Sequence, residues 1–304
     1  MGSDVGVPTR NLEDIVRTFL ARDLANWIKS DPQARAGDDE GIHQIRVSAR
    51  RLRAELGVVA PHMRRPALTL LRGELRWIGS ILGRQRDLDV LRHTLMDATP
   101  HPERTSSLVH DVERQRDDSR LLVQDALNSR RYRQLVTSVA DAAIAPPWRR
   151  HATRETEDLL HGVQRHVAAL TSLLADDGDD PTDEQLHHVR IAVKRCRYGA
   201  EVAAMILSPS AAQLATSFTL AQDVLGNLHD TVIALAYIDS APLLLDDRDA
   251  HAPTTGDALR SARARLRTEW RAPVDAALAL AQSLAFVPTR DATSGETGTY
   301  QSVP

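Results

Sequence analysis

Apolar residues recur along this 304-residue chain with the period of an α-helix. Leu12, Ile15 and Phe19, for example, fall three and four residues apart, as one face of a helix requires. The same period predicts helices over about 10–30, 41–60, 66–97, 103–128, 130–144, 150–175, 182–207, 211–239 and 257–285. No segment shows the two-residue alternation of a half-buried strand, so the pattern predicts an all-α fold.

Segments rich in proline, glycine and acidic residues separate these helices. Asp31-Pro32 is expected to end the first helix, and Pro146-Pro147 divides the chain into two halves. We expect one folded unit over 10–285, with a first helical repeat at about 10–145 and a second at about 150–285. A flexible N-terminus is predicted over 1–9, and a disordered tail over 286–304.

A basic segment occurs twice, once in each half. The sequence HQIRVSARRLR starts at His43, and HHVRIAVKRCR starts at His187, 144 residues later. In both, a histidine is followed by cations at the third, seventh, eighth and tenth positions. A second pair, LGRQRD from Leu82 and LGNLHD from Leu225, follows in the same order. Two ordered repeats at nearly the same offset indicate an internal duplication.

The cations gather on one face of each basic helix. On a helical wheel, His43, Arg46 and Arg50 lie together, with Arg53 at the border of the apolar face. The second copy places its charged residues in the same way: His187, Arg190 and Lys194, with Arg197 at the border. Neither segment contains an acid, although a solvated helix face normally mixes signs because like charges one turn apart repel. We therefore predict that the two rows converge on a shared anion.

The predicted helix after the first basic segment adds candidates. One of its faces carries Arg72, Arg76, Gly79, Gly83 and Arg86. The two glycines would leave room either for a ligand or for a neighbouring helix, and both alternatives remain open. The matching face of the second half is far less cationic, so we expect the halves to contribute unequally. The acids that close the second repeated pair are expected to orient arginines or to stabilise a turn: Asp87 and Asp230.

Composition narrows the class of ligand. A net charge of −3 argues against a general nucleic-acid binder, and an aromatic content of 4% leaves few platforms for stacked bases. Lysine occurs only at Lys29 and Lys194; the dominance of arginine suits phosphate binding as well as it suits a GC-rich genome. The single cysteine, Cys196, excludes an internal disulfide, and no apolar run is long enough for a membrane span. These features predict a cytoplasmic protein.

The duplicated His-x-x-Arg helix, each copy followed by Leu-Gly-x-x-x-Asp, resembles the CHAD family (conserved histidine α-helical domain) over about 10–285. The resemblance implies two pseudo-twofold-related helical bundles that form one CHAD-type unit. It also implies a basic surface between the bundles that binds inorganic polyphosphate, with association to polyphosphate granules and their proteins. The chain is expected to be a stand-alone member, because no triphosphate-tunnel domain is visible in the sequence.

Position by position, the resemblance implies that the ligand-facing residues are His43, Arg46, Arg50, Arg53, His187, Arg190, Lys194 and Arg197. Second-rank candidates are Arg51, Arg72, Arg76, Arg86, Arg131, Arg133 and Arg195. The sequence departs from the family pattern twice: Lys194 replaces an arginine, and His229 stands where the family places a small polar residue. Protonated histidines at 43 and 187 would bind a phosphate chain more tightly at mildly acidic pH.

Other functions remain as alternatives. A phosphohydrolase is disfavoured because the chain has no Walker loop, no His-Glu-x-x-His motif and no clustered carboxylates. Metal binding is disfavoured because His187 and His188 are adjacent and point in different directions on a helix. A helical scaffold whose basic face binds an acidic protein or a nucleic acid is the main rival. We expect a non-catalytic binding protein with no cofactor and no metal.

Overall fold

The computed structural model describes residues 11–99, 106–150, 157–176, 180–205, 209–241 and 254–284. The expected flexible N-terminus at 1–9 and the expected tail at 286–304 lie outside these ranges. The prediction of an all-α fold is confirmed: helices make up every regular element within the described ranges. The nearest approach to a β-structure there is one isolated bridge between Met63 and Trp148.

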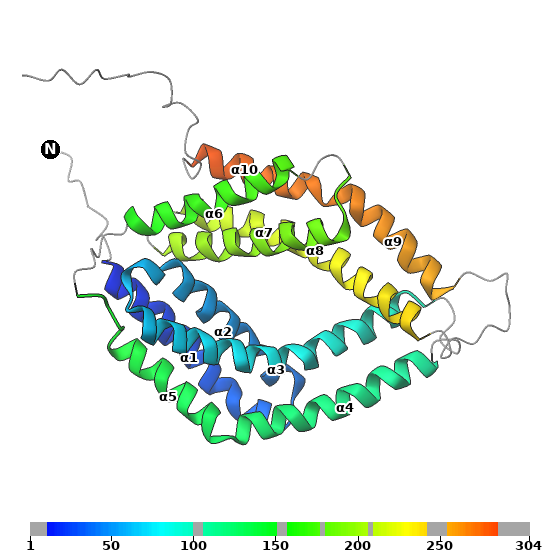
Figure 1. Cartoon of the computed structure of the whole chain (residues 1–304), viewed down its shortest axis with the longest axis horizontal. Coiled ribbons are helices and arrows are strands. Elements are labelled where there is room, and N and C mark those ends of the chain that lie inside the picture. Colours follow the sequence, from blue (N-terminus) through cyan, green and yellow to red (C-terminus); the bar gives the residue numbers. More distant parts are fainter. Residues whose placement is uncertain are drawn as a thin grey trace, which may run out of the picture.

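The helices fall into two sets along the chain (Figure 1). The first half contains α1 (Leu12–Arg35), α2 (Asp39–Val58), the short 3₁₀ helix η1 (Ala60–His62), α3 (Arg65–Asp97), α4 (Ser106–Asn128) and α5 (Arg130–Ile144). The second half contains α6 (Glu157–Asp176), α7 (Asp183–Ala204), α8 (Pro209–Ser240), α9 (Thr255–Glu269) and α10 (Arg271–Ser283).

The predicted end of the first helix is wrong. The helix continues through Pro32 to Arg35 and stops before Gly37, whose φ of 85° is a left-handed conformation that glycine adopts readily. Pro32 removes one backbone hydrogen bond, but the last turn is held by an ion pair of 2.7 Å between Arg35 and Asp31. Burial of Ala34 also fixes this turn, because the start of α2 packs directly against it.

Each half has its own hydrophobic core. The core of the first half is built around Phe19, Trp27 and Tyr132, and the indole N–H of Trp27 donates a 2.7 Å hydrogen bond to the Tyr132 hydroxyl. The core of the second half surrounds Phe218 and Trp270. Separate cores make each half a bundle in its own right, so the space between the bundles is free to serve another purpose.

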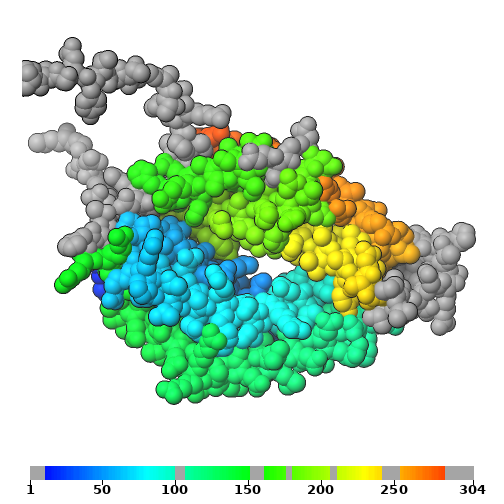
Figure 2. Space-filling model, viewed as in Figure 1, coloured from blue at the N-terminus to red at the C-terminus, as the bar shows by residue number. Residues whose placement is uncertain are grey.

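The bundles touch at two places. At the first, which we call the α2–α7 junction, α2 packs against α7 and Val202 of α7 enters the core of the first half. At the second, which we call the distal junction, the far ends of α3 and α4 pack against α8 and α9 through a separate buried cluster that includes Leu95, Leu108 and Ile238. The space-filling view in Figure 2 shows an opening between these two junctions.

Candidate functional site

Local sequence fixes the orientation of both basic helices. The Asp38 side chain caps α2 by accepting a 2.8 Å hydrogen bond from the Gly41 N–H, and Thr182 and Gln185 form a reciprocal capping box at the start of α7. The apolar faces are fully buried, with Ile45 in one core and Val189 in the other. The cations on the opposite faces therefore point towards the space between the bundles.

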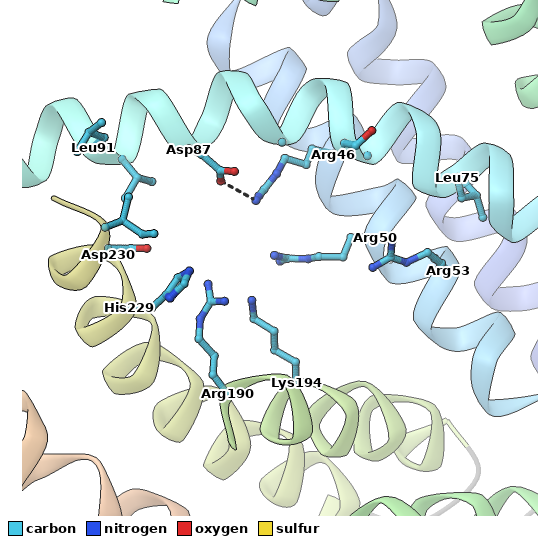
Figure 3. Close-up of a pocket in the computed structure, with 15 residues that line it drawn as sticks. Arg46, Arg50, Arg53, Leu75, Asp87, Leu91, Arg190, Lys194, His229 and Asp230 are labelled. Carbon is cyan, nitrogen blue, oxygen red and sulfur yellow. Dashed lines mark ion pairs between the residues drawn. The ribbon is translucent and has the colours of Figure 1, made fainter. Parts of the chain in front are cut away.

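A cavity of about 530 Å³ lies in this space, walled by α2, α3, α7 and α8 (Figure 3). Its charged and histidine lining residues are Arg46, Arg50, Arg53, Asp87, Arg190, Lys194, His229 and Asp230. Five of these side chains are cations and two are carboxylates, so the lining is basic although the whole chain is slightly acidic. Five of the eight residues predicted to face the ligand thus line one cavity.

The two basic rows converge. Burial lowers the pKa of Lys194 to about 7, and the next causes are the positive charges of Arg190 on its own helix and of Arg50 and Arg46 on α2. Burial also lowers the pKa of Arg190, and Arg50 across the cavity contributes. Cations from both halves therefore repel one another across the cavity, which is the situation that a bound polyanion would relieve.

The first row extends beyond the cavity at both ends. At one end, burial and the charge of Arg86 lower the pKa of His43, which lies with Arg86 in a smaller hollow beside Asp39. At the other end, burial and the charges of Arg76 and Arg72 lower the pKa of Arg53. The cations of α2 and α3 thus form a continuous strip along the first half.

Two carboxylates accompany the cations, one in each half. Asp87 lies 3.7 Å from the Arg46 guanidinium. Burial raises the pKa of Asp230, and the positive charge of Arg190 partly offsets this rise. Asp87 and Asp230 occupy matching positions in the two sequence repeats, as do Arg46 and Arg190. Each acid lies where it can hold an arginine towards the cavity.

Two arginines that line the cavity each have a guanidinium nitrogen without a hydrogen-bond partner in the described part of the chain. Within the described residues, the Nε atoms of Arg50 and Arg190 are buried and make no hydrogen bond. Buried polar groups are normally paired, so these two arginines are incompletely satisfied within the protein. Their side chains reach into the cavity (Figure 3), where the guanidinium ends suit an oxyanion.

The histidines of the second half form a small group next to the cavity. The rings of His187 and His229 lie 4.8 Å apart, and burial together with Arg190 lowers the pKa of both, to about 4 for His229. His187 itself lines a narrow adjoining hollow. Among the described residues, no group of three or more histidine, cysteine or acidic side chains has the arrangement of a metal site.

Two predicted residues are held by carboxylates instead. Arg197 pairs with Glu201 at 3.1 Å and stacks over Tyr198, whereas its counterpart Arg53 lines the cavity. Arg51 bridges the bundles, 3.4 Å from Glu201 of α7 and 3.7 Å from Asp23 of α1. Both arginines therefore belong to the α2–α7 junction.

The remaining second-rank residues lie on other surfaces. Arg131 is exposed, forms two hydrogen bonds to Glu74 and stacks over Trp77 at 4.1 Å. Arg133 is exposed and donates to the Asn128 carbonyl, and Arg195 is exposed. None of these three lines the cavity.

Sequence reasoning missed the buried charges beneath the junction. Asp23 and Glu55 are fully buried, and Arg22 pairs with both, at 2.9 and 2.5 Å. Burial and the neighbouring Asp23 raise the pKa of Glu55. The available signal was an acid at a core position of the wheel: Glu55 lies between Leu52 and Leu56, which are both buried.

Comparison with known families settles the classification. The CHAD domain profile matches residues 18–239, about three quarters of the chain. This chain belongs to the CHAD family. CHAD domains are known for binding polyphosphate. None of the described helices is long and apolar enough to span a membrane.

The chain is also similar to curated relatives and, in fold, to solved structures. Proteins described as uncharacterised, from two strains of Mycobacterium tuberculosis, are each 28% identical over 242 residues, which is 74% of this chain and 45% of theirs. The chain thus spans less than half the length of these relatives. PptA from Streptomyces chartreusis has a TM-score of 0.66 at 20% identity, covering 90% of this chain and 100% of that one. The CHAD domain of the plant Ricinus communis also reaches 0.66, at 24% identity, covering 90% and 92%.

Proposed function

We propose that this CHAD protein binds inorganic polyphosphate, without catalysis, in the cavity between its two bundles. The observation that carries the proposal is the convergence of Arg46, Arg50 and Arg53 of one half with Arg190 and Lys194 of the other. The duplicated sequence, with one CHAD-type unit over 10–285 built from two pseudo-twofold-related bundles, explains why both halves contribute to one site. Association with polyphosphate granules and their proteins in the cytoplasm is part of this proposal.

The chemistry of the lining favours a phosphate chain over a nucleic acid. Successive helix turns present cations about 5–6 Å apart, which a repeating polyanion can follow. Arginine forks match phosphate oxygens in a bidentate way. Among the described residues that line the cavity, the His229 imidazole is the single aromatic ring, so this lining offers little for stacked bases.

A binding titration with long-chain polyphosphate tests the proposal. The double variant Arg46→Glu/Arg190→Glu reverses one cation on each wall. A hydrogen bond to a charged group contributes about 1.5–3 kcal/mol, so losing two should weaken binding by roughly a hundredfold or more. Circular dichroism should show the helices retained.

The matched control is Arg133→Glu/Arg195→Glu, which makes the same charge change at one exposed position in each half, away from the cavity. We expect it to retain most of the affinity. Equal loss in both double variants, or undiminished binding by the cavity variant, would contradict the proposed site. Displacement of polyphosphate by single-stranded DNA at equal phosphate concentration would instead favour the rival scaffold, a general anion trap.

A further inference from the structure

The opening between the bundles is closed on all sides by protein. In Figure 2 it is bordered by α2 and α3 below and by α7 and α8 above, with the two junctions at its ends. A ligand inside the opening would therefore be encircled, unlike a ligand on an open groove.

Buried apolar contacts and polar interactions hold both junctions together. At the α2–α7 junction, buried Val202 joins the core of the opposite bundle, and Arg51 connects Asp23 to Glu201 across it. At the distal junction, the Tyr237 hydroxyl of α8 donates a 2.5 Å hydrogen bond to Asp111 of α4. The hydroxyls of Thr99 and Thr255 lie 3.3 Å apart beside it. Opening either junction would expose buried apolar side chains or unpair buried charges.

The cavity also continues into a second hollow. Val90 and Asp230 line both the basic cavity and a neighbouring hollow of about 650 Å³ between α3, α8 and α9. Arg86, His93 and Arg265 line this second hollow, so a chain that leaves the cavity there meets further basic groups. Where Gly79 of α3 lines the cavity, an added Cβ would meet no described atom within 4 Å, so no described helix fills the space beside it.

We propose that the anion passes through the closed opening as a thread, with the protein as a ring around it. This inference rests on the proposed function and deepens it, because it restricts the ligand to linear, unbranched polyanions that have at least one free end. Binding then requires a chain end to enter, and release requires a chain end to leave.

The test uses long-chain polyphosphate carrying biotin at both ends. The protein is loaded with this polymer at low salt, both ends are then capped with streptavidin, and the complex is passed through a gel-filtration column at about 1 M salt. At this ionic strength the Debye length is about 3 Å, so electrostatic attraction alone no longer holds the complex together. A threaded chain stays with the protein, whereas a chain on an open surface is released.

A disulfide across the distal junction sharpens the test. The variant Thr99→Cys/Thr255→Cys places two thiols where the hydroxyls lie 3.3 Å apart, and Cys196, the natural cysteine, is buried and does not compete. With the disulfide formed, polymer capped after loading should co-elute in 1 M salt, and polymer capped before mixing should not. The reduced variant is the matched control.

Release of the capped polymer from the locked protein at high salt would overturn threading. If the disulfide does not form, the rates at which polymer dissociates from the wild-type protein test threading instead. Threading predicts that doubly capped polymer dissociates at least about tenfold more slowly than uncapped polymer. Equal dissociation rates refute threading. Absence of binding at low salt would instead refute the proposed function, so the two failures are distinguishable.

Discussion

At the scale of single residues, Lys194 gives the cavity a charge that changes near neutral pH. Its pKa lies at about 7 because burial and the neighbouring arginines disfavour the ammonium form. Bound phosphates would raise this pKa, so above pH 7 binding must take up a proton. Affinity should therefore be highest below pH 7 and should fall by up to about tenfold per pH unit above it, until the pKa of the bound state is reached.

Titrations at pH 6, 7, 8 and 9 check this. Lys194→Arg, which stays charged throughout, should flatten the profile between pH 7 and pH 9. His43→Gln/His187→Gln should not remove the decrease in affinity above pH 7. The pKa values of both histidines are lowered, so these side chains gain their charge, and affect binding, at acidic pH. A wild-type profile that is flat from pH 6 to pH 9 would contradict the role of Lys194 and the expectation drawn from the histidines.

The residue scale also shows how far the sequence determines the site. The helical wheel placed Arg46, Arg50, Arg190 and Lys194 on the inner faces, because helix period alone sets that direction. It did not separate Arg197 from its counterpart Arg53, although the chain carries the difference: Glu201 lies one turn after Arg197 and pairs with it, whereas Gly57 stands one turn after Arg53. The arginines of α3 that lie near Arg53 are different, because they are tertiary neighbours and have no signature in the spacing of α2.

At the scale of the element, α3 carries a glycine where its cavity-facing surface is open. Gly79 lies inside the helix, where glycine is less favourable than alanine by about 1 kcal/mol. Gly79→Ala should therefore raise the free energy of unfolding by about that amount and leave polyphosphate affinity unchanged, because the added methyl group has space. Gly79→Trp, which adds bulk but no charge, should weaken binding at least tenfold.

Denaturant unfolding and the polyphosphate titration measure the two effects separately. If Gly79→Trp binds as well as Gly79→Ala, the ligand does not use the space beside Gly79. Because no described atom lies within 4 Å of a Cβ placed at Gly79, a packed helix does not explain this glycine, and the pair tests the ligand alternative on a measurement independent of charge.

Helix boundaries show the same division between local and tertiary information. The capping residues Asp38 and Thr182 could be read from the chain, since each caps through its own side chain. The end of α1 could not, because Asp31-Pro32 is a local stop signal and the last turn is kept by Arg35 and by packing against α2. The distal junction was equally hidden, since its buried apolar residues come from four helices.

At the scale of the whole molecule, one ligand connects two bundles that have separate cores. Anything that binds the folded state alone stabilises it by mass action, by about 2.7 kcal/mol at a ligand concentration of one hundred times the dissociation constant. Because the cavity is walled by α2 and α3 of one bundle and by α7 and α8 of the other, this stabilisation applies only while both are folded. Polyphosphate should therefore raise the unfolding temperature of both halves together.

Calorimetry with and without polyphosphate measures this coupling. We expect a single transition that moves to higher temperature with the ligand, and no shift for Arg46→Glu/Arg190→Glu, which keeps both cores but loses the shared anion. A ligand-induced shift confined to one of two resolved transitions would mean that one bundle binds alone. That result would contradict a site shared between the halves even if the affinity of the wild type were high.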